Sequence, residues 1–553
     1  MPRFKSMLAA TAALAVTSTC LAGALQAADR SMQPIAGDPV QTESGRIAGT
    51  QLPSGVKAYL GIPFAQPPVG DLRWAPPRPA HWSGIFNADR KGAECIQVLR
   101  PHNINHYFGE EASGEDCLSL NLWTPATARA GDKRPVIVFI YGGGYTIGSS
   151  GMANYDGEAM AKAGAVFVNF NYRVGAMGFL AHPELTREQG GASGNYGLMD
   201  QTLALQWVRA NIARFGGAPD KVVIMGQSAG AGSVAAQILS PGARGLFRAA
   251  VMSSGCNLRA PKPTLAEAEK IGLAMQEKLG AHSLAEMRDI PADRILAAQA
   301  ESQLGLAVSG VHINGPIVDG RVLPEQAAAA IASGHYTKVP MIASFNEDDL
   351  NFGYGPLVSA ATVAQYEAAA AKLFGADAPA FLKLYPAKTD AEVRVTARIA
   401  AQDGGMAANA RACAMDTQGP VFIDKFTRHH PYIPGVKLAD QDTATVGAYH
   451  TADIPYWLGT QDAYNALRPT RQWTPWDRTL AQRMIGALLA LAETGSPDTP
   501  AMPWKAWSMT NDTALWLGDT VEPHRFDIAG QAWLAAHRPV AAPMPSAAAR
   551  PRD

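Results

Sequence analysis

A short run of β-branched residues near the middle of the chain leads directly into a Gly-x-Ser-x-Gly motif. The run covers residues 222–224, the motif covers residues 226–230, and small residues follow. This order is typical of a buried strand, a sharp turn and the start of a helix, with glycines where strand and helix approach closely. We expect the turn to hold Ser228 in a strained backbone geometry that exposes its hydroxyl.

A serine in such a turn is a nucleophile only if the chain also supplies a base, an acid and an oxyanion site. The continuous apolar run 135–140 predicts a strand covered on both faces, and Gly142, Gly143 and Gly144 follow it. Successive glycines expose main-chain N–H groups that can stabilise an oxyanion, although a flexible turn is the simpler alternative.

An acidic cluster stands in the order expected for a hydrolase of the sequence Ser, acid, His. The strand pattern of residues 339–345 runs into Glu347, Asp348 and Asp349, well after the serine. Taken alone, acidic residues at a strand end indicate a solvated turn. Their place in the chain makes them candidates for the acid that orients a histidine base.

The remaining patterns predict an α/β fold. The strand at 165–170, the helix at 197–215 and the strand ending at Ser228 form a strand-helix-strand unit, so the sheet is locally parallel. Residues 42–79 suggest antiparallel edge strands, 115–125 a half-exposed strand, and 246–252 and 419–426 further strands. An amphipathic helix is expected at 476–495.

One large domain, residues 29–538, accounts for these patterns, with helical insertions at about 261–334 and 357–418 that roof the active site. Thr264 and Glu267 have the spacing of a helix capping box. The last stretch, 539–553, is rich in Ala, Pro and Arg and is expected to be disordered.

The N-terminus has the pattern of a secretory signal peptide, residues 1–28. Basic Arg3 and Lys5 precede an apolar stretch, and small residues offer a cleavage site after Ala27 or Ala28. A membrane anchor is the alternative, disfavoured because the apolar part is short. The expected location is therefore periplasmic or extracellular.

Five cysteines are present, of which Cys20 lies in the expected signal peptide. The four that follow it are Cys95, Cys117, Cys256 and Cys413, an even number compatible with disulfides in an exported protein. Cys95 and Cys117 would close a short loop. Cys256 and Cys413 are also able to pair, but nothing in the sequence places them together.

The composition argues against several classes of partner. A net charge of −1 without a long basic run disfavours nucleic acid and anionic membranes. No His, Asp and Glu cluster has metal-ligand spacing, and no phosphate-binding glycine loop is complete. We therefore expect a small-molecule substrate and no metal or cofactor.

Several motifs together resemble the type-B carboxylesterase family, the cholinesterase-like branch of the α/β-hydrolases. The likeness runs from about residue 42 to about residue 507, and its marks are segments 60–65, 115–118, 141–144, 194–198, 226–230 and the segment around His450. The resemblance implies that Ser228 is the nucleophile, His450 the base and Asp349 the acid that orients it. It also implies oxyanion donors at Gly143, Gly144 and Ala229.

Three structural links follow from the same resemblance. It implies a Cys95–Cys117 disulfide and two ion pairs, Arg73 with Glu115 and Arg173 with Asp200.

The chain departs from the family pattern at the acid and beside the serine. Asp349 stands where Glu is common, so Asp348 is the alternative acid, and Gln227 replaces a common Glu next to the serine. The loop between Cys95 and Cys117 has no tryptophan for a quaternary ammonium group, although Tyr107 and Phe108 are weak substitutes. No choline-ester specialisation is expected.

These observations predict a carboxylic-ester hydrolase that works through an acyl-enzyme. Tyr145, Phe352, Tyr354 and Trp457 adjoin catalytic segments and favour apolar or aromatic esters. Alternatives are a non-catalytic cholinesterase-like binding protein, or hydrolysis of a lactone, carbamate or amide. Cysteines next to the catalytic serine and histidine would indicate a tannase or feruloyl esterase, but Gln227 and Thr451 stand there. The oligomeric state, monomer or weak oligomer, is left open.

Overall fold

The structure is a computed structural model that describes residues 33–299, 302–303, 306–307, 313, 315–351 and 353–537. The expected signal peptide, the expected disordered tail and Phe352 lie outside these residues. Among the described segments, no helix combines the length and apolar character needed to cross a bilayer.

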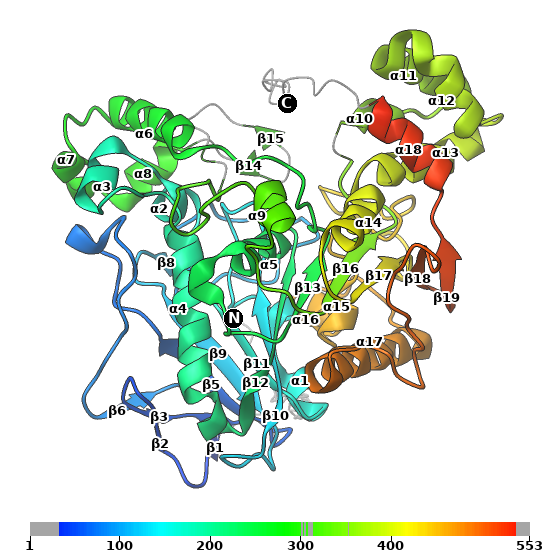
Figure 1. The fold of residues 1–553 in the computed structure, drawn as a ribbon. Coiled ribbons are helices and arrows are strands. Elements are labelled where there is room, and N and C mark those ends of the chain that lie inside the picture. Colours follow the sequence, from blue (N-terminus) through cyan, green and yellow to red (C-terminus); the bar gives the residue numbers. More distant parts are fainter. Residues whose placement is uncertain are drawn as a thin grey trace, which may run out of the picture.

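A twelve-stranded sheet runs through the molecule (Figure 1). In spatial order its strands are β1 (Gln33–Pro34), β4 (Thr50–Gln51), β5 (Lys57–Pro63), β9 (Ser119–Thr124), β11 (Val166–Phe170), β10 (Arg134–Ile140), β12 (Gly217–Gln227), β13 (Ala249–Ser253), β16 (Met341–Asn346), β17 (Val421–Phe426), β18 (Thr513–Leu517) and β19 (Val521–Arg525). Neighbours from β11 to β18 pair in parallel, while the edges are antiparallel. The expected mostly parallel sheet is confirmed.

Helices flank this sheet (Figure 1). They include α4 (Tyr196–Asn211), extended by the short helix η3 (Ile212–Phe215), α5 (Ala229–Leu239) and α17 (Pro475–Thr494). Shorter helices are α1 (Glu158–Lys162), α2 (Gly175–Phe179), α3 (Pro183–Glu188), α15 (Ile454–Trp457), α16 (Ala463–Ala466) and α18 (Ile528–Ala536). Central strands such as β11 and β12 are buried because α/β packing covers both of their faces.

Two sets of helices leave the sheet between strands. The first contains α6 (Leu265–Leu279), α7 (Leu284–Asp289), α8 (Ala292–Ala298) and α9 (Ala327–Ser333); the second contains α10 (Gly355–Val358), α11 (Val363–Phe374), α12 (Ala378–Leu384), α13 (Asp390–Gly404) and α14 (Met406–Asp416). Figure 1 shows α6–α8 and α10–α13 on opposite sides of the upper part of the molecule. The capping box at Thr264 and Glu267 is confirmed at the start of α6.

Three small sheets complete the described strands. They are β2 (Val40–Gln41) with β3 (Arg46–Ala48) and β6 (Ile85–Asn87), β7 (Glu94–Cys95) with β8 (Ser113–Gly114), and β14 (Ser302–Gln303) with β15 (Leu306–Ala307). The sequence did not predict the β18–β19 hairpin at the far edge of the large sheet.

The strand at 115–125 differs from its prediction because β9 is buried on both faces. Its alternating polar residues are not solvated. Asn121 donates to Asn169 Oδ1 at 2.9 Å and accepts from the Gly61 N–H at 2.9 Å, and Thr124 donates to the Phe215 carbonyl at 2.8 Å. Internal hydrogen bonds replace water, so polar alternation here does not mark an exposed face.

A second hydrophobic cluster, distinct from the main core, lies within α10–α13 and includes Leu534 of α18. Asp403 borders this cluster and accepts hydrogen bonds from the Tyr385 hydroxyl at 3.2 Å and the Gln531 amide at 3.4 Å. Burial raises the pKa of Asp403 to about 6.

This raised pKa predicts a pH-dependent stability that Asp403→Asn removes. An unfolded Asp ionises near pH 4, so the stability held by the neutral native carboxyl is complete below that pH and is lost as the pH rises through about 6. Two pKa units correspond to about 3 kcal/mol. Chemical unfolding at pH 5 and pH 8 should therefore show the variant gaining stability relative to wild type at pH 8.

The matched control is Glu367→Gln, because Glu367 is exposed on α11 in the same helical unit. It should shift unfolding equally at both pH values. An Asp403→Asn effect that is the same at pH 5 and pH 8 would contradict the prediction.

Candidate active site

The turn after β12 has the geometry that its motif predicts. Ser228 has φ +58° and ψ −123°, a conformation that L-residues rarely adopt, and it caps the N-terminus of α5. A Cβ at Gly226 would lie 2.2 Å from the Gly230 carbonyl oxygen, and one at Gly230 would lie 2.0 Å from the Ile140 carbonyl oxygen. Only glycine fits at these positions, because the backbones of strand and helix are in direct contact there.

The sequence-predicted residues lie beyond the carboxyl ends of adjacent parallel strands. Gly143 follows β10, Ser228 follows β12, Asp349 follows β16 and His450 lies in the connection after β17. The strand order β10-β12-β13-β16-β17 brings these ends together at one edge of the sheet. This edge is where α/β folds place their ligand sites.

Asp349 and His450 are in direct contact. His450 Nδ1 lies 2.6 Å from Asp349 Oδ1, and the carboxylate also accepts from Ser254 Oγ at 2.5 Å and from the Asn346 N–H at 3.0 Å. Burial raises the pKa of the Asp349 carboxyl, but the charge of His450 and these hydrogen bonds outweigh it and hold the pKa below its ordinary value. The carboxylate is therefore ionised at neutral pH.

Asp348, the alternative acid, contacts a different partner. Its Oδ2 lies 2.9 Å from Arg398 Nη2 and 3.1 Å from the Gly447 N–H. The two neighbouring carboxylates thus have separate surroundings, and it is Asp349 that reaches the imidazole.

Gln227 contacts the other nitrogen of His450. The distance from Gln227 Nε2 to His450 Nε2 is 3.1 Å. An amide nitrogen only donates, so His450 Nε2 accepts and the ring proton is on Nδ1, facing Asp349. The described residues include no hydrogen bond between Ser228 Oγ and His450. Gln227, which contacts His450 Nε2 instead, directly precedes Ser228 in the chain.

The three expected oxyanion donors have no acceptor of their own within the described residues. The N–H groups of Gly143, Gly144 and Ala229 donate no hydrogen bond there. Ala229 is the first residue of α5, where a free N–H is the normal consequence of a helix start. Gly142 lies between the two loops, since a Cβ on it would be 3.0 Å from Ser228 Cβ.

Three of the aromatic residues proposed for a pocket lie within the described residues, and their surroundings differ. Trp457 is fully buried in the main core, and Tyr354 is buried in the second cluster. Tyr145 is partly exposed and packs against Phe179 with ring centroids 5.3 Å apart. Of the described members of this set, Tyr145 alone is partly exposed, because the other two serve packing.

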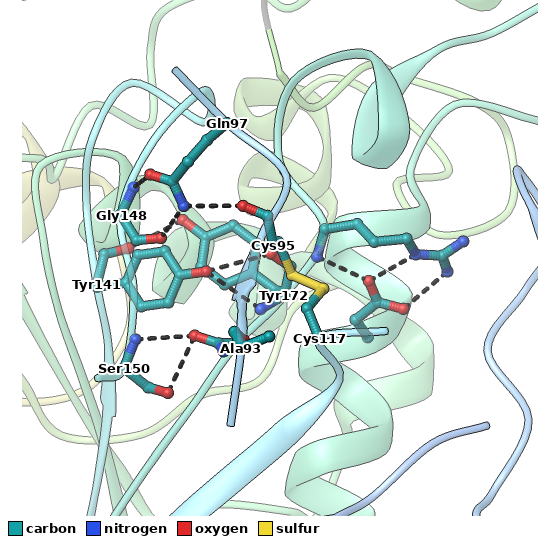
Figure 2. Close-up of a disulfide and its surroundings, with 11 residues drawn as sticks. Ala93, Cys95, Gln97, Cys117, Tyr141, Gly148, Ser150 and Tyr172 are labelled. Carbon is teal, nitrogen blue, oxygen red and sulfur yellow. Dashed lines mark hydrogen bonds and ion pairs between the residues drawn. A yellow bond between two sulfur atoms is a disulfide. The ribbon is translucent and has the colours of Figure 1, made fainter. Parts of the chain in front are cut away.

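Two disulfides are present. Cys95–Cys117 joins positions 22 apart in the sequence, and Cys256–Cys413 joins the segment after β13 to α14, a pairing that the sequence could not place. Figure 2 shows the Cys95–Cys117 bridge beside Tyr141 and Tyr172, whose rings stack at 4.5 Å.

Both expected ion pairs are confirmed. Arg73 Nη2 lies 2.6 Å from Glu115 Oε2, and Arg173 Nη2 lies 2.7 Å from Asp200 Oδ1. Each pair also has a second guanidinium contact, so both are bidentate.

Sequence reasoning missed Ser254 and His106. Ser254 has φ +54° directly after β13 and donates to Asp349 Oδ2, while His106 Nε2 lies 2.5 Å from Thr451 Oγ1, next to His450. A polar residue directly after a central parallel strand is a signal that could have indicated Ser254. The His106 contact joins positions 345 residues apart, for which a single sequence offers no signal.

A mostly parallel sheet with a strained strand-turn-helix at Ser228 after β12 and a His–Asp pair at the same edge defines an α/β-hydrolase. Solved structures agree. A PNB esterase matches with a TM-score of 0.70 and 27% identity over 91% of this chain and 99% of its own, and a thermophilic PNB esterase matches with a TM-score of 0.71 and 27% identity over the same shares.

Sequence comparisons show which α/β-hydrolases the chain is similar to. The chain is 39% identical to fumonisin B1 esterase of Sphingopyxis macrogoltabida over 64% of its own length and 63% of that protein's, and 30% identical to para-nitrobenzyl esterase of Bacillus subtilis strain 168 over 85% and 92%. The aligned part thus spans slightly less than two thirds of the fumonisin B1 esterase.

A profile of the carboxylesterase family matches residues 37–528. The chain therefore belongs to the carboxylesterase family, as its motifs predicted. This membership and the esterase relatives support ester hydrolysis.

Proposed function

We propose that this carboxylesterase hydrolyses neutral carboxylic esters through a covalent acyl-enzyme on Ser228. The observation that carries the proposal is the 2.6 Å contact between His450 Nδ1 and Asp349, with His450 Nε2 directed at the nucleophile turn. This tautomer leaves the Nε2 lone pair free to take a proton once Gln227 yields its place. Catalytic hydrogen bonds often tighten only when substrate binds.

In the proposed reaction, Ser228 Oγ attacks the ester carbonyl while His450 Nε2 accepts its proton. The tetrahedral oxyanion receives hydrogen bonds from Gly143, Gly144 and Ala229, whose N–H groups have no other acceptor among the described residues. His450 then protonates the leaving alcohol. Water repeats the sequence to release the acid, and Asp349 stays ionised throughout.

The proposed substrate is uncharged and apolar or aromatic. Gln227 is neutral and buried beside the imidazole, so this position offers no anion to attract a cationic substrate. Tyr145 supports an apolar wall, because its partly exposed ring packs against Phe179 while its hydroxyl lies against Gly232 of α5, near the turn that carries Ser228.

A matched substrate panel tests this function. It contains a para-nitrobenzyl ester, the bond named for a relative, the corresponding amide, and a choline ester with the same acyl group. We expect the neutral ester to have the highest kcat/KM, with the choline ester no better and the amide slower by orders of magnitude. Absence of ester turnover in the folded protein would indicate a non-catalytic binding protein. Faster turnover of the amide would indicate that an amide, and not an ester, is the bond hydrolysed.

Export is proposed with the function. Two disulfides in the described residues suit an oxidising compartment.

A further inference from the structure

The loop closed by Cys95 and Cys117 reaches across the molecule to the segment that contains His450. Consecutive residues near its tip hold main-chain and side-chain contacts there: the Asn103 carbonyl accepts from the Ala439 N–H at 3.0 Å, the Ile104 carbonyl accepts from Arg468 Nη2 at 2.6 Å, and the Asn105 N–H donates to Asp440 Oδ1 at 2.9 Å. The loop tip is thus fixed against residues far away in the sequence.

His106 makes the contact nearest to the site. Its Nε2 lies 2.5 Å from Thr451 Oγ1, and its Nδ1 lies 3.7 Å from Asp440 Oδ2. The His106 side chain is 21% exposed. Thr451 directly follows His450, so the imidazole of His106 acts on the backbone that carries the proposed base.

Thr451 has a backbone conformation that needs support. Its φ is +83°, in a region that is costly for a β-branched residue. Such a conformation persists only where surrounding contacts hold it. The hydrogen bond between His106 Nε2 and Thr451 Oγ1 fixes the Thr451 side chain and so opposes a return of this backbone to a relaxed conformation.

The same loop is also attached to the segment that follows the glycine loop. Gln97 Nε2 donates to the Gly148 carbonyl at 2.8 Å, and the Gly148 N–H donates to Gln97 Oε1 at 2.7 Å. Figure 2 shows this pair of bonds beside the disulfide. One disulfide-closed loop therefore connects the oxyanion side of the site with the histidine side.

We propose that His106 is a positioning residue that acts through Thr451 to hold His450 in its working orientation. This inference rests on the proposed function. Without His106, the Thr451 backbone relaxes and the His450 imidazole populates several orientations. Only one of them directs Nδ1 to Asp349 and Nε2 to the nucleophile turn. Turnover should fall while substrate binding changes little, because His106 contacts no proposed substrate group.

The test measures kcat and KM of the full-length enzyme with the para-nitrobenzyl ester. His106→Ala should lower kcat at least tenfold and change KM less than threefold. Thr451→Val, which removes the hydroxyl but keeps the shape, should produce the same loss, and Thr451→Ser should restore most of the rate. The double variant His106→Ala/Thr451→Val should be no slower than either single variant, since both remove one contact.

His102→Ala is the matched control. His102 lies in the same loop, is exposed and has its ring 4.4 Å from that of Tyr107. We expect it to keep the wild-type kcat.

Three results would overturn the inference: a kcat of His106→Ala within twofold of wild type, multiplicative losses in the double variant, or an equal loss in Thr451→Ser and Thr451→Val. If His106→Ala does not fold, the comparison of Thr451→Ser with Thr451→Val decides alone. Labelling by a serine-directed phosphonate tests the proposed function separately from the positioning role of His106. A label on Ser228 with unchanged His106→Ala turnover refutes only the positioning role, whereas wild type without a label at Ser228 refutes the proposed function.

Discussion

Replacing Ser228 by Ala should lower kcat for the neutral ester about 10⁵-fold or more, because loss of the proposed nucleophile removes the covalent route and leaves only binding and oxyanion stabilisation. The fold should survive. Ala is as strained as Ser at φ +58°, and the Ser228 hydroxyl has no hydrogen bond within the described residues that the fold would lose.

The control is Ser240→Ala, at the other end of the helix that begins after Ser228. It should turn over like wild type. Steady-state turnover and a thermal melt of both variants check the prediction, and undiminished turnover by a cleanly folded Ser228→Ala enzyme would refute the assignment of the nucleophile.

Asp349→Asn should reduce kcat about 10³- to 10⁴-fold, as expected when an amide replaces the acid of a Ser-His-Asp triad. An Asn side chain can present its NH₂ group to the imidazole. His450 Nδ1 then becomes the acceptor and the proton moves to Nε2, which can no longer accept the proton of Ser228. The variant therefore keeps the orientation of the imidazole, but His450 can no longer act as the base.

Asp348→Asn is the natural comparison because it makes the same chemical change one residue away. Asp348 pairs with Arg398 and does not reach the imidazole, so its loss should cost far less turnover. Parallel measurements of kcat across pH 6 to 9 for both variants would show whether a large loss is specific to Asp349. Equal losses would reopen the assignment of the acid.

The sequence was informative wherever a candidate site residue follows a strongly apolar strand. Ser228, the glycines after β10 and Asp349 all have this placement, so strand patterns and family motifs located them together. His450 lies in a connection after β17 with no helix or strand between residues 427 and 453, and only the family resemblance singled it out.

Contacts between distant residues could not be predicted in the same way. The pairing of Cys256 with Cys413 depends on how α14 packs beside the segment after β13, and 157 residues separate the two sulfurs. Likewise, the placement of the Gln227 amide on His450 Nε2 depends on side-chain geometry. The motif shows that the charge of a Glu is absent beside the serine, but not which atom the amide contacts.

The sequence does not show which polar residues are buried. The strand at 115–125 was expected to be half exposed, but β9 is buried. Similarly, His430 is 5% exposed, and both of its ring nitrogens form hydrogen bonds within the protein. Its partners are the Ala452 carbonyl and the Tyr449 hydroxyl, on either side of His450. Hydrogen bonds that form only in the folded chain determine whether a polar residue can be buried.

The most direct test is to quench the enzyme during turnover of the para-nitrobenzyl ester and to measure the mass of its active-site peptide. We predict that the peptide containing Ser228 gains the mass of the acyl group in wild type and gains nothing in Ser228→Ala. Ester turnover without any acyl group on Ser228, or with the group on another residue, would contradict the proposed mechanism.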